Sequence, residues 1–134
     1  MNQGEIRFLS LDDILALHDM QIERFGGAPG IRDRGLLESA VAMPQASFGG
    51  AFVHQSLYEM AAAYAFHIAE NQPFIDGNKR TALVAALVFL DWHQFEVEEP
   101  GEELYHAMIQ LAEKKLDKTG LSHLFERLSM RGHE

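Results

Sequence analysis

Apolar positions recur along most of the chain with the spacing of amphipathic helices, and residues that start or stop helices separate the periodic segments. The predicted helices run from Ser10 to Gly26-Gly27, from Asp33 to Met43, from Ser56 to Pro73, over about 78–93, from Pro100 onward and over about 118–130. Two short alternating stretches, 5–9 (EIRFL) and 95–98 (FEVE), are predicted to be strands. The pattern therefore predicts an all-α fold with at most these two short strands.

The pattern also indicates which side chains form the core. Residues expected to face inward are Leu36, Leu37, Ala40 and Val41 in the second helix and Leu104, Met108, Ile109, Leu111 and Ala112 in the fifth. The third and fourth helices are the most apolar and are expected to be central. Between the second and third helices, PQASFGGAFVHQS (44–56) is expected to be exposed and irregular, and is the best candidate for a flap.

Composition narrows the possible classes of function. The chain has 134 residues, which predicts one domain over 1–134, and its formal net charge of −9 argues against direct binding of nucleic acid across a broad basic face. The absence of cysteine excludes disulfides and thiolate metal sites. The apolar runs at 60–69 and 82–90 are too short to span a membrane. We therefore expect a cytoplasmic protein whose partners are small anions or other proteins.

The loop between the two most apolar helices, NQPFIDGNKR (71–80), concentrates groups that suit an anion. Backbone N–H groups of Gly77, Asn78 and Lys79 are predicted to be free at the positive end of the next helix, where phosphate or carboxylate binds. Arg80 adds a forked donor for phosphate oxygens. Asp76 is out of place beside bare phosphate but suits a Mg²⁺ ion held between a carboxylate and a nucleotide. A well-capped turn without a ligand explains the same residues about equally well.

A resemblance adds to this interpretation. The run PFIDGNKRTAL (73–83) resembles the signature of the Fic/Doc family, His-x-Phe-x-(Asp/Glu/other)-(Gly/Ala)-Asn-(Gly/Lys)-Arg, in which Phe74 and Asp76 through Arg80 match. The opening stretch FLSLDDILALHDMQIERFGGAPGIRDRGLLESAVAMPQASFGG (8–50) is similar to the N-terminal half of death-on-curing toxins. The resemblance implies an all-helical Fic fold that binds ATP with Mg²⁺ and modifies a protein hydroxyl.

The resemblance also implies a role for each matched residue. Phe74 would anchor the loop, Asp76 would orient the metal, the Gly77 to Lys79 backbone would hold the anion and Arg80 would grip a phosphate. Lys79 and Leu83 stand where the branch that transfers AMP has a second Gly and often a second Arg. In Doc-like members, a lysine at the position of Lys79 accompanies transfer of the γ-phosphate to elongation factor Tu. A separate antitoxin protein inhibits such toxins. We therefore expect a protein kinase; an adenylyltransferase and a non-enzymatic binding module are the alternatives.

Gln72 departs from the family pattern, because it stands where the family has its catalytic His. A carboxamide donates and accepts hydrogen bonds but has no usable pKa near neutrality, so it can position a hydroxyl without taking its proton. Loss of a general base costs roughly 10²–10⁴ in rate, so we expect impaired transfer. Of the other histidines, His67 is expected to face away from the loop, His54 could reach it only if the flap closes, and the remaining five have no clear link to it.

Overall fold

A computed structural model of the protein describes residues 5–98 and 102–129. Its helices are α1 (Leu11–Phe25), α2 (Arg34–Ala42), α3 (Leu57–Asn71), α4 (Asn78–Trp92), α5 (Glu103–Ala112) and α6 (Lys118–Leu128), with a 3-10 turn, η1 (Met43–Gln45), after α2. Two short strands, β1 (Ser47–Phe48) and β2 (Ala51–Phe52), pair antiparallel as a hairpin. The predicted all-α fold is confirmed, and the predicted start of the fifth helix at Pro100 falls outside the described residues.

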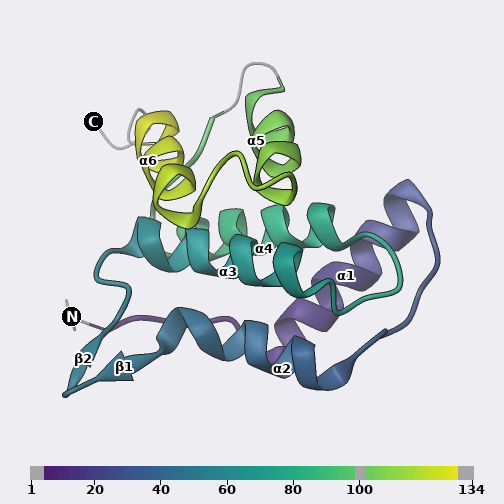
Figure 1. The fold of residues 1–134 in the computed structure, drawn as a ribbon, viewed down its shortest axis with the longest axis horizontal. Coiled ribbons are helices and arrows are strands. Elements are labelled where there is room, and N and C mark those ends of the chain that lie inside the picture. Colours follow the sequence, from purple (N-terminus) through teal and green to yellow (C-terminus); the bar gives the residue numbers. More distant parts are fainter. Residues whose placement is uncertain (1–4, 99–101, 130–134) are drawn as a thin grey trace.

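Three layers of helices make up the fold (Figure 1). The central pair, α3 and α4, lies between α1 and α2 on one side and α5 and α6 on the other. Small residues allow this arrangement, because Ala61, Ala62, Ala65, Ala82 and Ala86 of the central pair are fully buried and let the helices approach closely. Large side chains fill the remaining volume, as Tyr64 and Phe89 do where they pack against each other with their ring centroids 5.4 Å apart.

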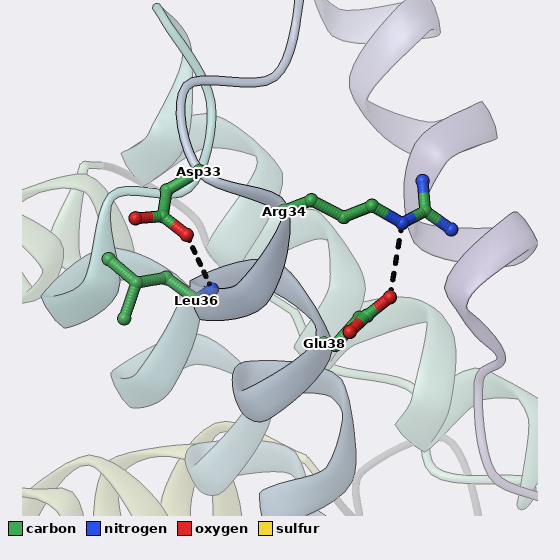
Figure 2. Close-up of polar contacts among 4 residues, drawn as sticks. All are labelled: Asp33, Arg34, Leu36 and Glu38. Atoms are coloured by element: carbon green, nitrogen blue, oxygen red, sulfur yellow. Dashed lines mark hydrogen bonds and ion pairs between the residues drawn. The ribbon is translucent and has the colours of Figure 1, made fainter.

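The helix boundaries follow the local start signals. Ser10 and Asp13 form a reciprocal capping box at the beginning of α1, and Ser56 accepts a hydrogen bond from the backbone N–H of Glu59 at the beginning of α3. Figure 2 shows the same role for Asp33, whose carboxylate accepts from the N–H of Leu36 at 3.0 Å in the first turn of α2. These contacts confirm the three predicted starts.

Both predicted strands are wrong. Residues 5–9 form no strand, and the N–H groups of two of them donate to side chains: Arg7 N–H donates to His93 Nε2 at 3.0 Å, and Leu9 N–H donates to the Tyr64 hydroxyl at 2.8 Å. Residues 95–98 are also irregular, and the Glu98 N–H donates to the backbone oxygen of Leu128. The alternation of apolar and polar residues that suggested strands arises because these irregular segments pack against helices, with Leu9 buried in the core.

Two inward positions are also wrong. Leu36 is 36% exposed because the buried face of α2 is formed by Leu37, Ala40 and Val41. Ala112 ends α5 and is exposed, whereas Leu104, Met108 and Leu111 of the same helix are buried as predicted.

Among the described residues, no helix combines the length and the apolar character that a membrane crossing requires.

Candidate active site

The candidate loop begins where α3 ends. Gln72 adopts the left-handed conformation (φ 47°, ψ 57°), which stops the helix one residue before Pro73. The Arg32 side chain fixes this turn, because its Nε donates to the Gln72 carbonyl at 2.7 Å and one terminal nitrogen donates to the Asn71 carbonyl at 2.8 Å. The backbone at Gln72 is thus held by a residue from another part of the chain, and its side chain is exposed.

The segment that connects α1 to α2, residues 26–33, runs beside the loop and pairs with its backbone; we call it the α1–α2 connector. Ile31 and Phe74 form an antiparallel bridge. Pro73 accepts from the N–H groups of Arg32 and Asp33 at 2.7 and 3.0 Å, and the Ile75 N–H donates to the connector at 3.0 Å. The loop therefore follows a path set by hydrogen bonds to a segment about forty residues earlier in the sequence.

The segment predicted to be a flap, 44–56, does not lie beside the loop; the α1–α2 connector does. The hairpin that forms within 44–56 lies at the beginning of α3, whereas the loop follows the end of α3 (Figure 1). A helix of 15 residues is about 22 Å long, so the hairpin stands on the opposite side of the fold. Its Phe52 packs on Phe8 with ring centroids 5.5 Å apart. The interpretation of 44–56 as a flap over this loop is therefore wrong.

Side chains lock the middle of the loop. The Asn78 carboxamide accepts from the N–H of Phe74 and donates to its carbonyl, both at 2.9 Å, so that it pairs with both backbone polar groups of one residue, as a neighbouring strand would. Phe74 is buried and stacks on the ring of His18 with centroids 3.8 Å apart. His18 Nε2 in turn lies 2.8 Å from the carbonyl oxygen of Asp76. Phe74 anchors the loop in the core, and Asn78 clamps it from the side.

The Asp76 carboxylate is exposed and held in place by backbone donors. Its Oδ2 accepts from the N–H of Ala28 at 3.2 Å and its Oδ1 from the N–H of Gly77 at 2.8 Å. These two hydrogen bonds lower the pKa of Asp76 from its ordinary value; loss of solvent opposes them in part, and the nearby Arg80 and His18 add still smaller lowering effects. The carboxyl group is therefore ionised at neutral pH, with lone pairs left for a cation.

Close approach by the connector explains one glycine. A Cβ atom on Gly27 would lie 2.7 Å from Asp76 Oδ2, and the backbone of Gly27 has φ +117°. Gly77, at φ +77° and ψ 20°, makes the left-handed turn into α4. Each glycine thus allows a backbone path that brings the carboxylate and the start of α4 together.

The first turn of α4 exposes backbone donors, although not the set that the sequence predicted. The N–H of Gly77 is already bonded to Asp76, and the first helical bond runs from Thr81 N–H to the Gly77 carbonyl at 3.0 Å. Among the described residues, no partner is seen for the N–H groups of Asn78, Lys79 and Arg80. The free donors are therefore shifted by one residue from the prediction and lie at the positive end of the α4 dipole.

The two cations of the loop differ in their surroundings. Arg80 is exposed, but a terminal nitrogen donates to the Gly26 carbonyl at 3.1 Å and its guanidinium carbon lies 5.4 Å from the Phe25 ring centroid. Lys79 is exposed and no hydrogen bond from it is seen within the described part of the chain. Arg80 is thus oriented by the end of α1, while Lys79 is free to move toward a ligand.

These groups border a cleft of about 380 Å³. Its lining joins the loop to α3 and α5: Ala69, Gln72, Ile75, Asp76, Gly77, Asn78, Lys79, Arg80, Tyr105 and Ala112. The structure therefore brings all six sequence-predicted site residues, Gln72 and Asp76 to Arg80, to one surface. Tyr105, an exposed aromatic residue of α5, was not predicted, because helical spacing marks it simply as an outward position.

The prediction for the histidines is wrong at one residue, His18. His18, which was given no link to the loop, is buried and supports both Phe74 and Asp76. Its spacing of four residues from the buried Ile14 is the signal that could have placed it on the inner face of α1. His54 and His67 both lie near Lys118, with Nε2–Nζ distances of 3.1 and 3.0 Å, and neither borders the cleft.

Comparison with known proteins agrees with this geometry. Residues 8–90, from the segment before α1 into α4, match the model of the Fic/DOC family. The chain belongs to the Fic/DOC family. It is 40% identical over 85 residues to the protein kinase doc of Escherichia phage P1, a match that spans 63% of this chain and 67% of that protein. It is 42% identical over 83 residues to the toxin Doc of Mycolicibacterium smegmatis, spanning 62% of this chain and 62% of the toxin.

The match to the Fic/DOC family contains the loop, the connector and His18, whereas α5 and α6 lie beyond it. Tyr105 is thus a feature of the cleft that the family match does not describe.

Proposed function

We propose that the chain is a Doc-type toxin, a phosphotransferase that uses Mg-ATP to modify a protein hydroxyl, and that Gln72 impairs this activity. The observation that carries the proposal is the meeting of an ionised, backbone-held carboxylate, Asp76, with three free N–H groups at the start of α4 in one cleft. Bare anions would be repelled by the carboxylate. A phosphate that arrives with a divalent cation is accommodated by both.

The nucleotide would be held by the first turn of α4. The N–H groups of Asn78, Lys79 and Arg80 would donate to a phosphate at the helix terminus, and the Arg80 fork is already oriented by the Gly26 carbonyl. Lys79 adds a mobile positive charge where the AMP-transferring branch has a glycine. Its bulk and charge favour a different phosphate at this position, which supports γ-phosphate transfer over transfer of AMP. The kinase name of the phage P1 relative supports the same choice.

The residues fit a Mg²⁺ ion carried by the nucleotide. Mg²⁺ is commonly bound through one or two carboxylates together with substrate phosphates and water, and Asp76 supplies one exposed carboxylate. Among the described residues, no group of three or more His, Cys, Asp or Glu side chains is placed to hold a metal without the nucleotide. Bound there, the ion would neutralise phosphate charge. The chain's own part is to orient the phosphates through the α4 terminus and Arg80.

Gln72 limits what the cleft can do to the attacking hydroxyl. It borders the cleft, and its exposed carboxamide can accept a hydrogen bond from a serine or threonine hydroxyl and hold it toward the phosphate. The carboxamide cannot take up the proton, so the hydroxyl must lose it to water. We expect transfer to be slower by roughly 10²–10⁴ than with histidine at this position.

The partners follow from the same assignment. We propose elongation factor Tu as the target of the toxin and a separate antitoxin protein as its inhibitor. The name of the Mycolicibacterium smegmatis relative, a Doc toxin, supports the assignment to a toxin and antitoxin pair.

The test is to restore the base and to follow each phosphate of ATP separately. Gln72→His is expected to add little backbone strain, because histidine is among the residues enriched in the left-handed conformation that Gln72 adopts. The restored protein is incubated with elongation factor Tu and with ATP labelled at either the γ- or the α-phosphate. We expect it to transfer label from the γ position and not from the α position. Transfer from the α position would support an adenylyltransferase instead and overturn the kinase proposal.

Two controls separate chemistry from binding. Gln72→His combined with Asp76→Asn keeps the size of the carboxylate while removing its charge, and is expected to lose transfer with the fold intact. Hydrogen exchange of the 72–80 amides with and without Mg-ATP measures binding directly. If ATP protects none of these amides and the restored protein transfers nothing, the chain is a non-enzymatic binding module.

A further inference from the structure

Residues of two kinds line the candidate active site. The start of α4 and the loop before it supply the charged and polar groups that suit phosphates and a cation. The rest of the lining is mostly apolar and comes from α3, the loop and α5: Ala69, Ile75, Tyr105 and Ala112. Triphosphate and Mg²⁺ interact with the first kind of residue alone, so the apolar lining indicates a ligand that also has a nonpolar part.

Tyr105 presents an aromatic ring at this cleft. It lies in the first turns of α5 and is 59% exposed. Its ring meets that of His106 at an angle of 65° with centroids 5.9 Å apart, so the two rings are not stacked. Tyr105 and Ala112 are seven residues apart and therefore lie on the same face of α5, about 10 Å from each other. The small side chain of Ala112 fills little of the volume along this face.

Ile75 is a second large apolar side chain that the fold leaves exposed at the cleft and yet holds in place. It is 56% exposed. Its N–H donates to the Gly30 carbonyl at 3.0 Å, and its Cδ1 lies so close to the connector that a Cβ atom on Gly30 would be 3.0 Å away. Exposed apolar side chains that border one cleft together with a few convergent polar groups are typical of a small-molecule site.

A nucleotide is the class of ligand that matches both kinds of lining. The cleft has a volume of about 380 Å³, within the range of roughly 300–1,000 Å³ that is usual for small-molecule sites. A ligand that fills it meets the free N–H groups at the start of α4 and the ring of Tyr105 at once. A nucleotide carries phosphates and a planar base in one molecule, and the base can stack on an aromatic side chain.

We propose that Tyr105 binds the base of the nucleotide by stacking, and that this ring makes the cleft prefer a nucleoside triphosphate to inorganic tripolyphosphate. The inference rests on the proposed function, because it takes the phosphates to lie at the start of α4. Tyr105 contributes to nucleotide binding and takes no part in the transfer itself. Stacking uses the face of the base and tolerates different ring substituents, so the same ring serves adenine and guanine.

The test compares two ligands that share three phosphates and differ in the base. Dissociation constants of Mg-ATP and of Mg-tripolyphosphate are measured by calorimetry on the full chain. We expect the unaltered chain to bind Mg-ATP at least about fivefold more tightly. Tyr105→Ala is expected to weaken Mg-ATP binding by about the same factor and to leave Mg-tripolyphosphate binding unchanged. Tyr105→Phe keeps the ring and is expected to keep the affinity, whereas Tyr105→Leu keeps apolar bulk without an aromatic face and is expected to lose most of it.

Phe48→Ala is the matched control. Phe48 is an aromatic residue of the hairpin that is 85% exposed and does not border the cleft, so its removal is expected to change neither dissociation constant. Circular dichroism checks that each variant is folded. A measurement that needs no variant is the nuclear Overhauser effect between protons of the bound base and those of the Tyr105 ring in the unaltered chain, which we expect to observe.

The outcomes separate this inference from the proposed function. Equal affinities of the unaltered chain for Mg-ATP and Mg-tripolyphosphate, equal losses of both in Tyr105→Ala, or no Overhauser effect with bound Mg-ATP would overturn the role of Tyr105 and leave the phosphate site standing. Loss of binding to elongation factor Tu in Tyr105→Ala, with Mg-ATP affinity unchanged, would assign the ring to the protein target instead. An unaltered chain that binds neither ligand would overturn the proposed function itself.

Discussion

Asn78 is the side chain whose removal most directly tests how the loop is held. Its carboxamide makes two hydrogen bonds of 2.9 Å to the peptide groups of Phe74 in a partly buried setting. Each such bond contributes about 0.5–1.5 kcal/mol net, and Asn78→Ala also leaves the Phe74 N–H and carbonyl without these partners. We expect the free energy of unfolding to fall by about 2 kcal/mol. With an entropy of unfolding of about 2.1 cal/mol/K per residue, this loss lowers the melting temperature by about 7 °C.

Urea unfolding followed by circular dichroism measures this loss, with two variants for comparison. Asn78→Asp keeps an acceptor for the Phe74 N–H but no donor for its carbonyl, and is expected to lose about half as much stability. Lys79→Ala changes the next residue, which is exposed, and is expected to stay within about 0.5 kcal/mol of the unaltered chain. A loss for Asn78→Ala no greater than that for Lys79→Ala would refute the role of the clamp.

Two further perturbations follow from the described contacts. Gly27→Ala is expected to lower the free energy of unfolding by about 1–3 kcal/mol, because the added methyl group would meet Asp76 at a residue with positive φ. Gly26→Ala is the control and is expected to cost less, since Gly26 also has positive φ but its methyl group would meet nothing within 4 Å. Equal losses of stability in urea unfolding would contradict the contact. Burial, and after it the charge of Lys118, lowers the pKa of His67 in the folded chain to about 4 from its ordinary 6.5, so the unfolded chain binds the proton first as the pH falls and stability is lost from about pH 6.5 toward pH 4. Unfolding free energies at pH 7 and 4.5 are expected to differ less in His67→Gln than in the unaltered chain, and an equal difference would argue against the lowered pKa.

Helices were predictable from this sequence because their signals are local. Ser10, Asp33 and Ser56 cap helices within three residues of themselves, and Pro73 follows the end of α3. The false strand at 5–9 shows where local pattern fails. An extended segment with alternating side chains can satisfy its backbone through side chains of distant helices, as Leu9 does through Tyr64, and no short-range signal distinguishes this from a sheet.

The loop itself was predictable as a contiguous motif, whereas its support was not. Asp76 to Arg80 are adjacent in sequence, so their chemistry could be judged together before their geometry was known. The α1–α2 connector and His18 reach the loop across 40 to 58 residues, and periodicity says nothing about contacts of that range. The glycines and the proline at 26–30 are typical of a turn, but no local signal indicates that the connector pairs with Pro73 through Arg32 and Asp33 and with Ile75 through Gly30.

The contacts of Arg32 bear on how a chain with Gln72 can persist. They hold the carbonyl groups of Asn71 and Gln72 and involve no side-chain atom of residue 72. A change of that side chain therefore leaves these contacts, and the turn that they hold, in place, even where it removes the proton acceptor of the proposed reaction. In the function proposed above, such a change would abolish toxicity without giving a misfolded product, and the altered chain would compete with an active copy for the same partner.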